Sequence, residues 1–195
     1  MNSRTMYDQI VDMAERSLLE VTLEAAKRDG QMLTPQGHPV ERLTEGVSIR
    51  PVTTHADPRG SVFELYDPRW NWHPDALVFA YCFSIRPGFV KGWSLHREHE
   101  DRYVIVKGEM NLVLFDPRPE SSTYGEVCRI VLSESGRALV NVPKNVWHAD
   151  QNIGTSDAVV VNFPTLPYEH ANPDKYRLPL NTDLIPYSFG NVKGW

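Results

Sequence analysis

The sequence predicts an all-β domain, a barrel or a sandwich, preceded by an N-terminal α-helix. From residue 47 onward, short runs rich in Val, Ile, Phe and Tyr alternate with turn residues. About nine such runs follow one another with no helical stretch between them, which favours a sandwich or barrel over a parallel sheet. The chain has 195 residues, enough for one such domain and an appended element.

Glycine and proline residues bound each predicted strand. The strands are expected at 47–52, 61–66, 76–85, 89–95, 103–107, 109–115, 127–132, 137–142 and 158–163. The tail from Pro164 is rich in Pro and Tyr without clear periodicity, and we expect it to wrap the barrel as loop or short helix. These features define a domain at 47–195.

The first thirty residues show the apolar spacing of a helix, from Tyr7 through Leu18 to Ala25. Gly30 stands where such a helix would end. Residues 31–46 mix Pro, Gly and polar residues and are typical of a connector, so the N-terminal element spans 1–46. Its apolar stripe is expected to cover the barrel of the same chain or a partner chain.

The formal net charge is –5, which argues against binding to nucleic acid or to an anionic membrane surface. No apolar stretch approaches membrane-spanning length, and the first residues lack the apolar core of a signal peptide. We therefore expect a cytoplasmic protein. Cys82 and Cys128 lie in apolar, strand-like runs, where buried reduced thiols are expected.

Two polar stretches interrupt the strand pattern. In the first, His96 is followed by Asp101 and then by Gly108; in the second, Pro143 precedes His148. Each stretch resembles one of the two cupin signatures, which implies a double-stranded β-helix, or jelly roll. Adjacent strands of such a barrel bring residues distant in sequence onto one inner face, and its mouth forms a natural small-molecule pocket. We expect a polar pocket around His96 and His148.

A closer resemblance covers roughly residues 50–170. In this region the chain is similar to the dTDP-4-dehydrorhamnose 3,5-epimerase family, a cupin group that needs no metal. The matching segments are DPRGSVFELY (57–66), PGFVKGWSLH (87–96), FDPRPESSTYG (115–125), VPKNVWH (142–148) and the region ending at Tyr168. The resemblance implies an isomerase of nucleotide-linked keto-deoxy-sugars, without a cofactor, that forms a homodimer.

The resemblance also implies roles for individual residues. His96 matches the base that removes the proton next to the sugar ketone, and imidazole suits that task near neutral pH. His148 matches the second histidine of the pocket. Arg59 and Glu64 match a motif whose arginine helps to hold the nucleotide diphosphate, and its planar fork suits phosphate oxygens.

Two further positions are expected to bind substrate. Lys91 stands at a ligand-binding arginine of the family, and supplies charge without the bidentate geometry of arginine. Tyr168 matches the tyrosine that stacks on the thymine ring.

Several positions depart from the family pattern. Asn162 replaces the general-acid tyrosine and remains a substrate-binding candidate, but an amide cannot protonate an enolate. Asp101 replaces a pocket lysine and so reverses its charge. The aspartate that orients the catalytic histidine has no clear counterpart, and Asp183 is the nearest candidate in the tail.

Three hypotheses about function follow. The first is an epimerase-like enzyme that uses His96 as base, with water, Tyr81 or Tyr168 as acid. The second is a metal cupin, with one divalent ion held by His96, Asp101 and His148. The third is a sugar- or nucleotide-binding module without catalysis.

Overall fold

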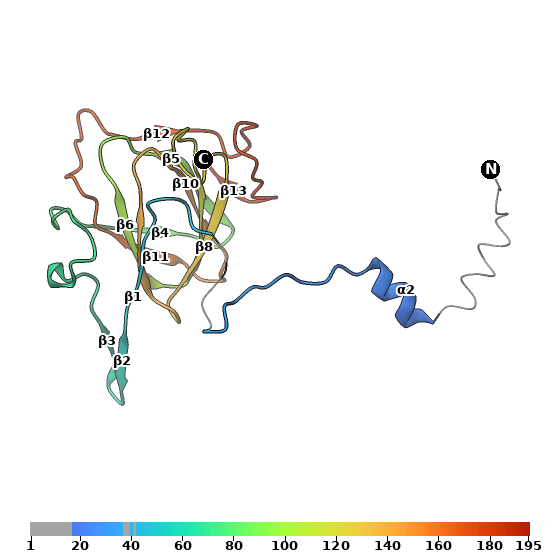
Figure 1. The fold of residues 1–195 in the computed structure, drawn as a ribbon. Helices are drawn as coiled ribbons and strands as arrows, with labels where there is room; N and C mark the ends of the chain where they lie inside the picture. Colours follow the sequence, from blue (N-terminus) through green and yellow to red (C-terminus); the bar gives the residue numbers. More distant parts are fainter. Residues whose placement is uncertain (1–16, 37–39, 41) are drawn as a thin grey trace. The chain divides into compact units, whose positions relative to one another are not determined.

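The computed structural model describes residues 17–36, 40 and 42–195 and divides the chain into two compact units, Met1–Glu41 and Arg42–Trp195 (Figure 1). In the first unit, helix α2 (Leu18–Ala25) starts at a capping box, in which Ser17 and Glu20 each accept the backbone N–H of the other. None of its residues is buried. Most of the predicted helix lies outside the described residues. The predicted end at Gly30 was wrong, because Ala26 already has an extended backbone.

The second unit is a jelly roll built from two antiparallel sheets. The first sheet runs in the order β1 (Ile49–Pro51), β9 (Ala138–Val142), β6 (Asp101–Lys107), β11 (Ala158–Asn162) and β4 (Tyr81–Ile85). The second runs in the order β12 (Tyr176–Arg177), β5 (Phe89–Leu95), β10 (Trp147–Asn152), β7 (Glu109–Phe115) and β8 (Val127–Ser133), and β13 (Lys193–Gly194) pairs in parallel with β5. The predicted all-β jelly-roll fold is confirmed.

A separate hairpin lies between β1 and β4 in the chain. It consists of β2 (Thr54–Asp57) and β3 (Gly60–Phe63), and a 3-10 turn, η1 (Pro68–Trp70), follows it. In Figure 1 the hairpin extends from the rest of the second unit. Within the described residues, no helix has the length and hydropathy needed to cross a bilayer.

The strands predicted from the sequence agree best with those of the structure where the predicted runs are apolar. Strands β5 and β7 have the predicted bounds, whereas the run predicted at 76–85 becomes a strand only from Tyr81. Strand β10 was missed, because its sequence WHADQN is mostly polar and lacks β-branched residues. Its pairing with both β7 and β5 makes it a strand. Cys82 is exposed, which contradicts the expected burial, while Cys128 is buried, and neither forms a disulfide.

The main core fills the space between the two sheets. Its fully buried members come from both layers, among them Ile105 and Val160 of the first sheet and Leu112 and Leu114 of the second. Tyr103 of β6 belongs to this core, and its hydroxyl group donates a hydrogen bond to the Asp101 carboxylate. The core therefore extends directly into a buried polar cluster.

A second apolar layer covers the outer face of the first sheet, where Phe163 packs with Tyr66. Arg102 is fully buried on this face. Its guanidinium group donates to the Tyr66 hydroxyl group and to the carbonyl oxygens of Asp75, Ala76, Phe163 and Pro164. Because side chains alternate along a strand, Asp101 next to it faces the interior.

Candidate active site

A buried carboxylate lies at the centre of the polar cluster. Asp101 begins β6 and is 1% exposed. Its Oδ2 accepts the hydroxyl hydrogen of Tyr103 at 3.0 Å, and its Oδ1 accepts a hydrogen from Asn162 Nδ2 at 2.7 Å. Both partners lie on inward-facing positions of adjacent strands, since Asn162 of β11 pairs with Tyr103 of β6. The sheet itself thus holds the carboxylate in place.

Three imidazole rings surround Asp101. His96 follows the end of β5, His99 lies in the connection to β6, and His148 is the second residue of β10. Their Nε2 atoms lie 3.3, 3.7 and 3.5 Å from the nearest Asp101 oxygen. The ring of His96 lies 4.1 Å from that of His99 and 5.3 Å from that of His148. The structure therefore brings the two predicted histidines together, as expected from the sequence.

The other nitrogen of each ring faces a different oxygen. His96 Nδ1 contacts the carbonyl oxygen of Asp174, and His148 Nδ1 lies 3.3 Å from the carbonyl oxygen of Val146. His99 Nδ1 lies 2.9 Å from the Asp174 carboxylate. Because an oxygen acceptor faces each Nδ1, every ring is favoured to carry a proton on that atom. The presence or absence of a second proton, on Nε2, then decides whether a ring can accept a proton.

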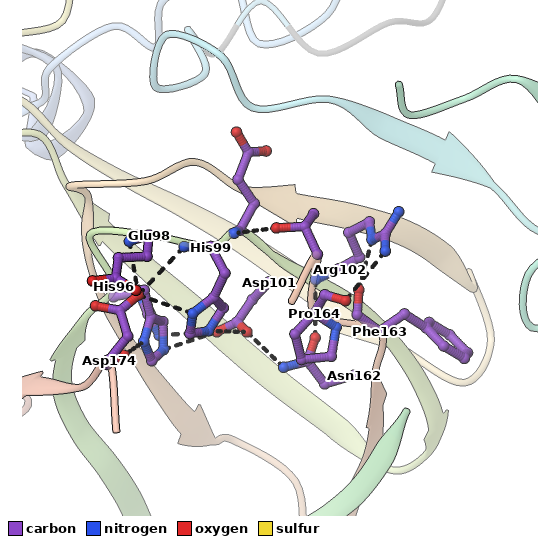
Figure 2. Close-up of polar contacts among 12 residues, drawn as sticks. His96, Glu98, His99, Asp101, Arg102, Asn162, Phe163, Pro164 and Asp174 are labelled. Carbon is purple, nitrogen blue, oxygen red and sulfur yellow. Dashed lines mark hydrogen bonds and ion pairs between the residues drawn. The ribbon is translucent and has the colours of Figure 1, made fainter. Parts of the chain in front are cut away.

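Asp174 is one of the site residues that sequence reasoning missed. Its carboxylate accepts the backbone N–H groups of Arg97 and Glu98 at 2.9 and 2.8 Å, and Figure 2 shows it beside His96 and His99. Strand β12 pairs Tyr176 with Leu95, which places the preceding tail residues against the end of β5. Asp183, the candidate named from sequence, lines a separate hollow within the C-terminal tail. No local pattern marks Asp174, because its place depends on this pairing.

The charges in the cluster shift one another's protonation. Burial alone would raise the pKa of Asp101, but hydrogen bonds from His96 and His99 hold it well below its usual value. Burial alone would lower the pKa of His96, but the hydrogen bond and the charge of Asp101 raise it. Burial lowers the pKa of His148 to about 3, and the charge of His96 adds to this effect. His148 is therefore neutral at pH 7, whereas a proton on His96 is stabilised.

A cavity of about 70 Å³ opens beside this cluster. Both sheets and the tail line it: Tyr81, Phe83, Lys91, Ser94, Tyr103, His148, Asp150, Lys175, Arg177 and Trp195. Burial and the charge of Asp101 raise the pKa of Asp150 to about 7. The cavity thus combines cationic, acidic and aromatic groups. This lining suits a small polar ligand with an anionic portion.

The other predicted substrate residues lie in different places. Lys91 lines the cavity, and Asn162 contacts two groups of the site, Asp101 and Tyr81. The Arg59 side chain is 90% exposed at the turn of the β2–β3 hairpin, paired with Asp57 at 2.6 Å. Glu64 is exposed just after β3, and Tyr168 is 46% exposed in the tail. Within one chain, Arg59, Glu64 and Tyr168 do not line the cavity, and their roles in substrate binding stay predictions.

Comparison with known proteins gives the family. The model of the dTDP-4-dehydrorhamnose 3,5-epimerase family matches residues 42–178, which include both barrel sheets up to β12. This chain belongs to that family. The match includes His96, Asp101 and His148 together with Asp174 of the tail.

Two relatives are similar in sequence to most of this chain. One is the probable low-salt glycan biosynthesis epimerase Agl13 of Haloferax volcanii, 31% identical over 134 residues, covering 68% of this chain and 86% of the relative. The other is the spore coat polysaccharide biosynthesis protein SpsL of Bacillus subtilis, 26% identical and covering 75% of this chain and 97% of the relative.

Solved structures share the fold at lower identity. A dTDP sugar isomerase from Desulfovibrio desulfuricans G20 superposes with a TM-score of 0.71 at 22% identity, covering 78% of this chain and 98% of that chain. A double mutant of ChmJ, a 3'-monoepimerase from Streptomyces bikiniensis, gives a TM-score of 0.68 at 19% identity, covering 80% of each chain.

The position of Asp174 gives a first prediction. Asp174→Ala removes the acceptor of three backbone N–H groups, those of Arg97, Glu98 and His99, and the partner of the His99 ring, so we expect the protein to lose about 1–3 kcal/mol of stability. Amide hydrogen exchange at residues 97–99 should rise more than exchange in β7, whose hydrogen bonds are untouched. Equal protection of both segments in the variant and the parent would contradict this role.

Proposed function

We propose that the protein epimerises a nucleotide-diphosphate-linked keto-deoxy-sugar. In this reaction His96 removes the proton from the carbon next to the ketone, and the resulting enolate takes up a proton on its other face. The observation that carries the proposal is the convergence of His96 and His148 on Asp101 beside one cavity. The family and the epimerase named among the relatives support the same class of reaction.

The surroundings of His96 suit a base. When Nε2 accepts a proton, the imidazolium ring donates to Asp101 on one side and to the Asp174 carbonyl oxygen on the other. This arrangement stabilises the charge that develops during proton removal. His148, neutral and 3% exposed, is suited to hold the sugar by a hydrogen bond rather than by charge.

Cations at the cavity support an anionic substrate. Lys91, Lys175 and Arg177 line it, and the ion pairs found among the described residues include none of the three. The Arg177 guanidinium group lies 3.7 Å from the centre of the Trp195 ring, which leaves its edge N–H groups free for phosphate oxygens. The guanidinium group of Arg177 therefore suits the charged diphosphate of a nucleotide-sugar better than it suits an uncharged sugar.

Solvent exchange tests the reaction directly. A dTDP-4-keto-6-deoxy-sugar incubated with the protein in D₂O should gain deuterium next to the ketone, as followed by NMR. His96→Ala should slow this exchange by on the order of 10²–10⁴-fold, the usual contribution of a positioned base. Exchange at the same rate in both proteins would reject His96 as the base. Ligand-dependent thermal stabilisation without any exchange would instead identify a binding module.

A metal-assisted form of the enolisation is the second candidate, and one observation favours it. The ligand atoms of His96, Asp101 and His148 all lie within 4.8 Å of one another, with Nε2–Oδ2 distances of 3.3 and 3.5 Å. Ligands bound to a tetrahedral ion at about 2.0–2.2 Å are about 3.3–3.6 Å apart. Oxygen acceptors on every Nδ1 are also typical of metal-binding histidines.

Elemental analysis separates the two candidates. The metal-assisted form predicts about one Zn, Mn, Fe or Ni ion per chain after expression in supplemented medium. His148→Ala should remove the ion, and a chelator should abolish deuterium exchange in the parent protein. Metal-free protein with undiminished exchange would eliminate this candidate and leave His96 as the base.

We further propose that the protein is a homodimer. The β2–β3 hairpin pairs with no other strand of the described chain, and it exposes Val62, which is 66% accessible. Unpaired strand edges of this kind are commonly covered by another chain. Light scattering should give about twice the 22.3 kDa mass of one chain. A monomer mass at micromolar concentration would contradict the proposal.

A further inference from the structure

The tyrosine missing from position 162 has a neighbour on the next strand. In the antiparallel pairing of β11 with β4, the Cα partner of Asn162 is Tyr81. Asn162 Nδ2 uses one hydrogen to bind Asp101 and the other to bind the Tyr81 hydroxyl oxygen at 2.9 Å. A phenol hydroxyl group therefore lies beside position 162, but the adjacent strand supplies it.

The hydrogen of this hydroxyl group is available. The Tyr81 oxygen acts as an acceptor toward Asn162, so that contact does not use its own hydrogen. Among the described residues, the hydrogen bonds include no acceptor for the Tyr81 O–H group. The Tyr103 hydroxyl group differs, because it donates its hydrogen to Asp101 at 3.0 Å. Tyr168 does not line the cavity at all.

Tyr81 also lies on the appropriate wall of the cavity. It belongs to β4 of the first sheet, whereas His148 belongs to β10 and His96 follows β5, both in the second sheet. Tyr81 and His148 both line the cavity, from opposite sheets, and the ring of His96 lies 5.3 Å from that of His148. A substrate carbon that reaches His96 between the sheets would have imidazole on one side and phenol on the other. Inversion at carbon requires removal of a proton from one face and delivery to the opposite face.

We propose that Tyr81 is the general acid of the epimerisation, in place of the tyrosine that Asn162 replaces. This assignment rests on the proposed function. His96 Nε2 takes the proton as the C–H bond breaks, and the electron pair moves into the ketone to give an enolate. The Tyr81 O–H bond then breaks as a new C–H bond forms on the opposite face. Proton exchange with solvent restores the phenol and the neutral imidazole.

The surroundings keep Tyr81 protonated before the reaction. Burial raises the pKa of its hydroxyl group above the ordinary value, and the negative charge of Asp101 adds to this effect. The hydroxyl group therefore holds its proton throughout the neutral range. The hydrogen bond from Asn162 acts in the other direction, because it stabilises the tyrosinate that remains after proton transfer.

Tyr81→Phe tests the assignment, because it removes the hydroxyl group and keeps the ring that packs near Phe79 and Phe83. Two rates are measured by NMR with dTDP-4-keto-6-deoxyglucose in D₂O: deuterium wash-in and formation of the epimer. We expect wash-in to stay within about threefold of the parent, since His96 can remove and return a proton on one face. Epimer formation should fall by on the order of 10²-fold or more. Tyr124→Phe, on an exposed loop, is the matched control and should change neither rate.

The outcomes separate the two proposals. Wash-in by the parent protein together with normal epimer formation by Tyr81→Phe would overturn the assignment of Tyr81 as the general acid and keep His96 as the base. Loss of both rates in Tyr81→Phe would also overturn it, because the hydroxyl group would then act through Asn162 and Asp101. Absence of deuterium wash-in with the parent protein would reject the proposed function itself, and with it the assignment of Tyr81 as the general acid.

Discussion

The buried negative charge of Asp101 is the constraint on which the functional end of this barrel depends. A carboxylate that is 1% exposed is stable only when donors or positive charge surround it. Tyr103 and Asn162 supply two hydrogen bonds, and the imidazoles of His96, His99 and His148 supply further contacts. The same contacts that stabilise the carboxylate therefore position the rings that carry the proposed chemistry.

This constraint connects two of the departures from the family pattern. The resemblance gives a lysine at position 101 and a tyrosine at position 162, and this chain has aspartate and asparagine. The amide of Asn162 can donate to a carboxylate and to a phenol oxygen at once, so Asp101 and Tyr81 are bridged by one side chain. The two substitutions form one hydrogen-bonded unit and are best understood together.

The C-terminal tail is part of both the fold and the site. Its residues Ile185 and Phe189 cover the outer face of the second sheet, where they pack with Val90 and Trp93. Strand β12 in the same tail positions Asp174 against the histidines. Burial of apolar area by the tail thus stabilises the barrel and orders the end that holds the histidines at the same time.

The sequence by itself determined the all-β class and most strands, because apolar alternation is a local property of the chain. The expectation that His96 and His148 share a pocket rested on the resemblance to the cupin signatures. Only the tertiary structure revealed strand β10, the role of Asp174 and the contact between Tyr81 and Asn162. The first depends on pairing with β5 and β7, the second on β12, and the third on the register of β11 with β4. Pairing between strands distant in sequence decides such contacts, and no local pattern encodes a register.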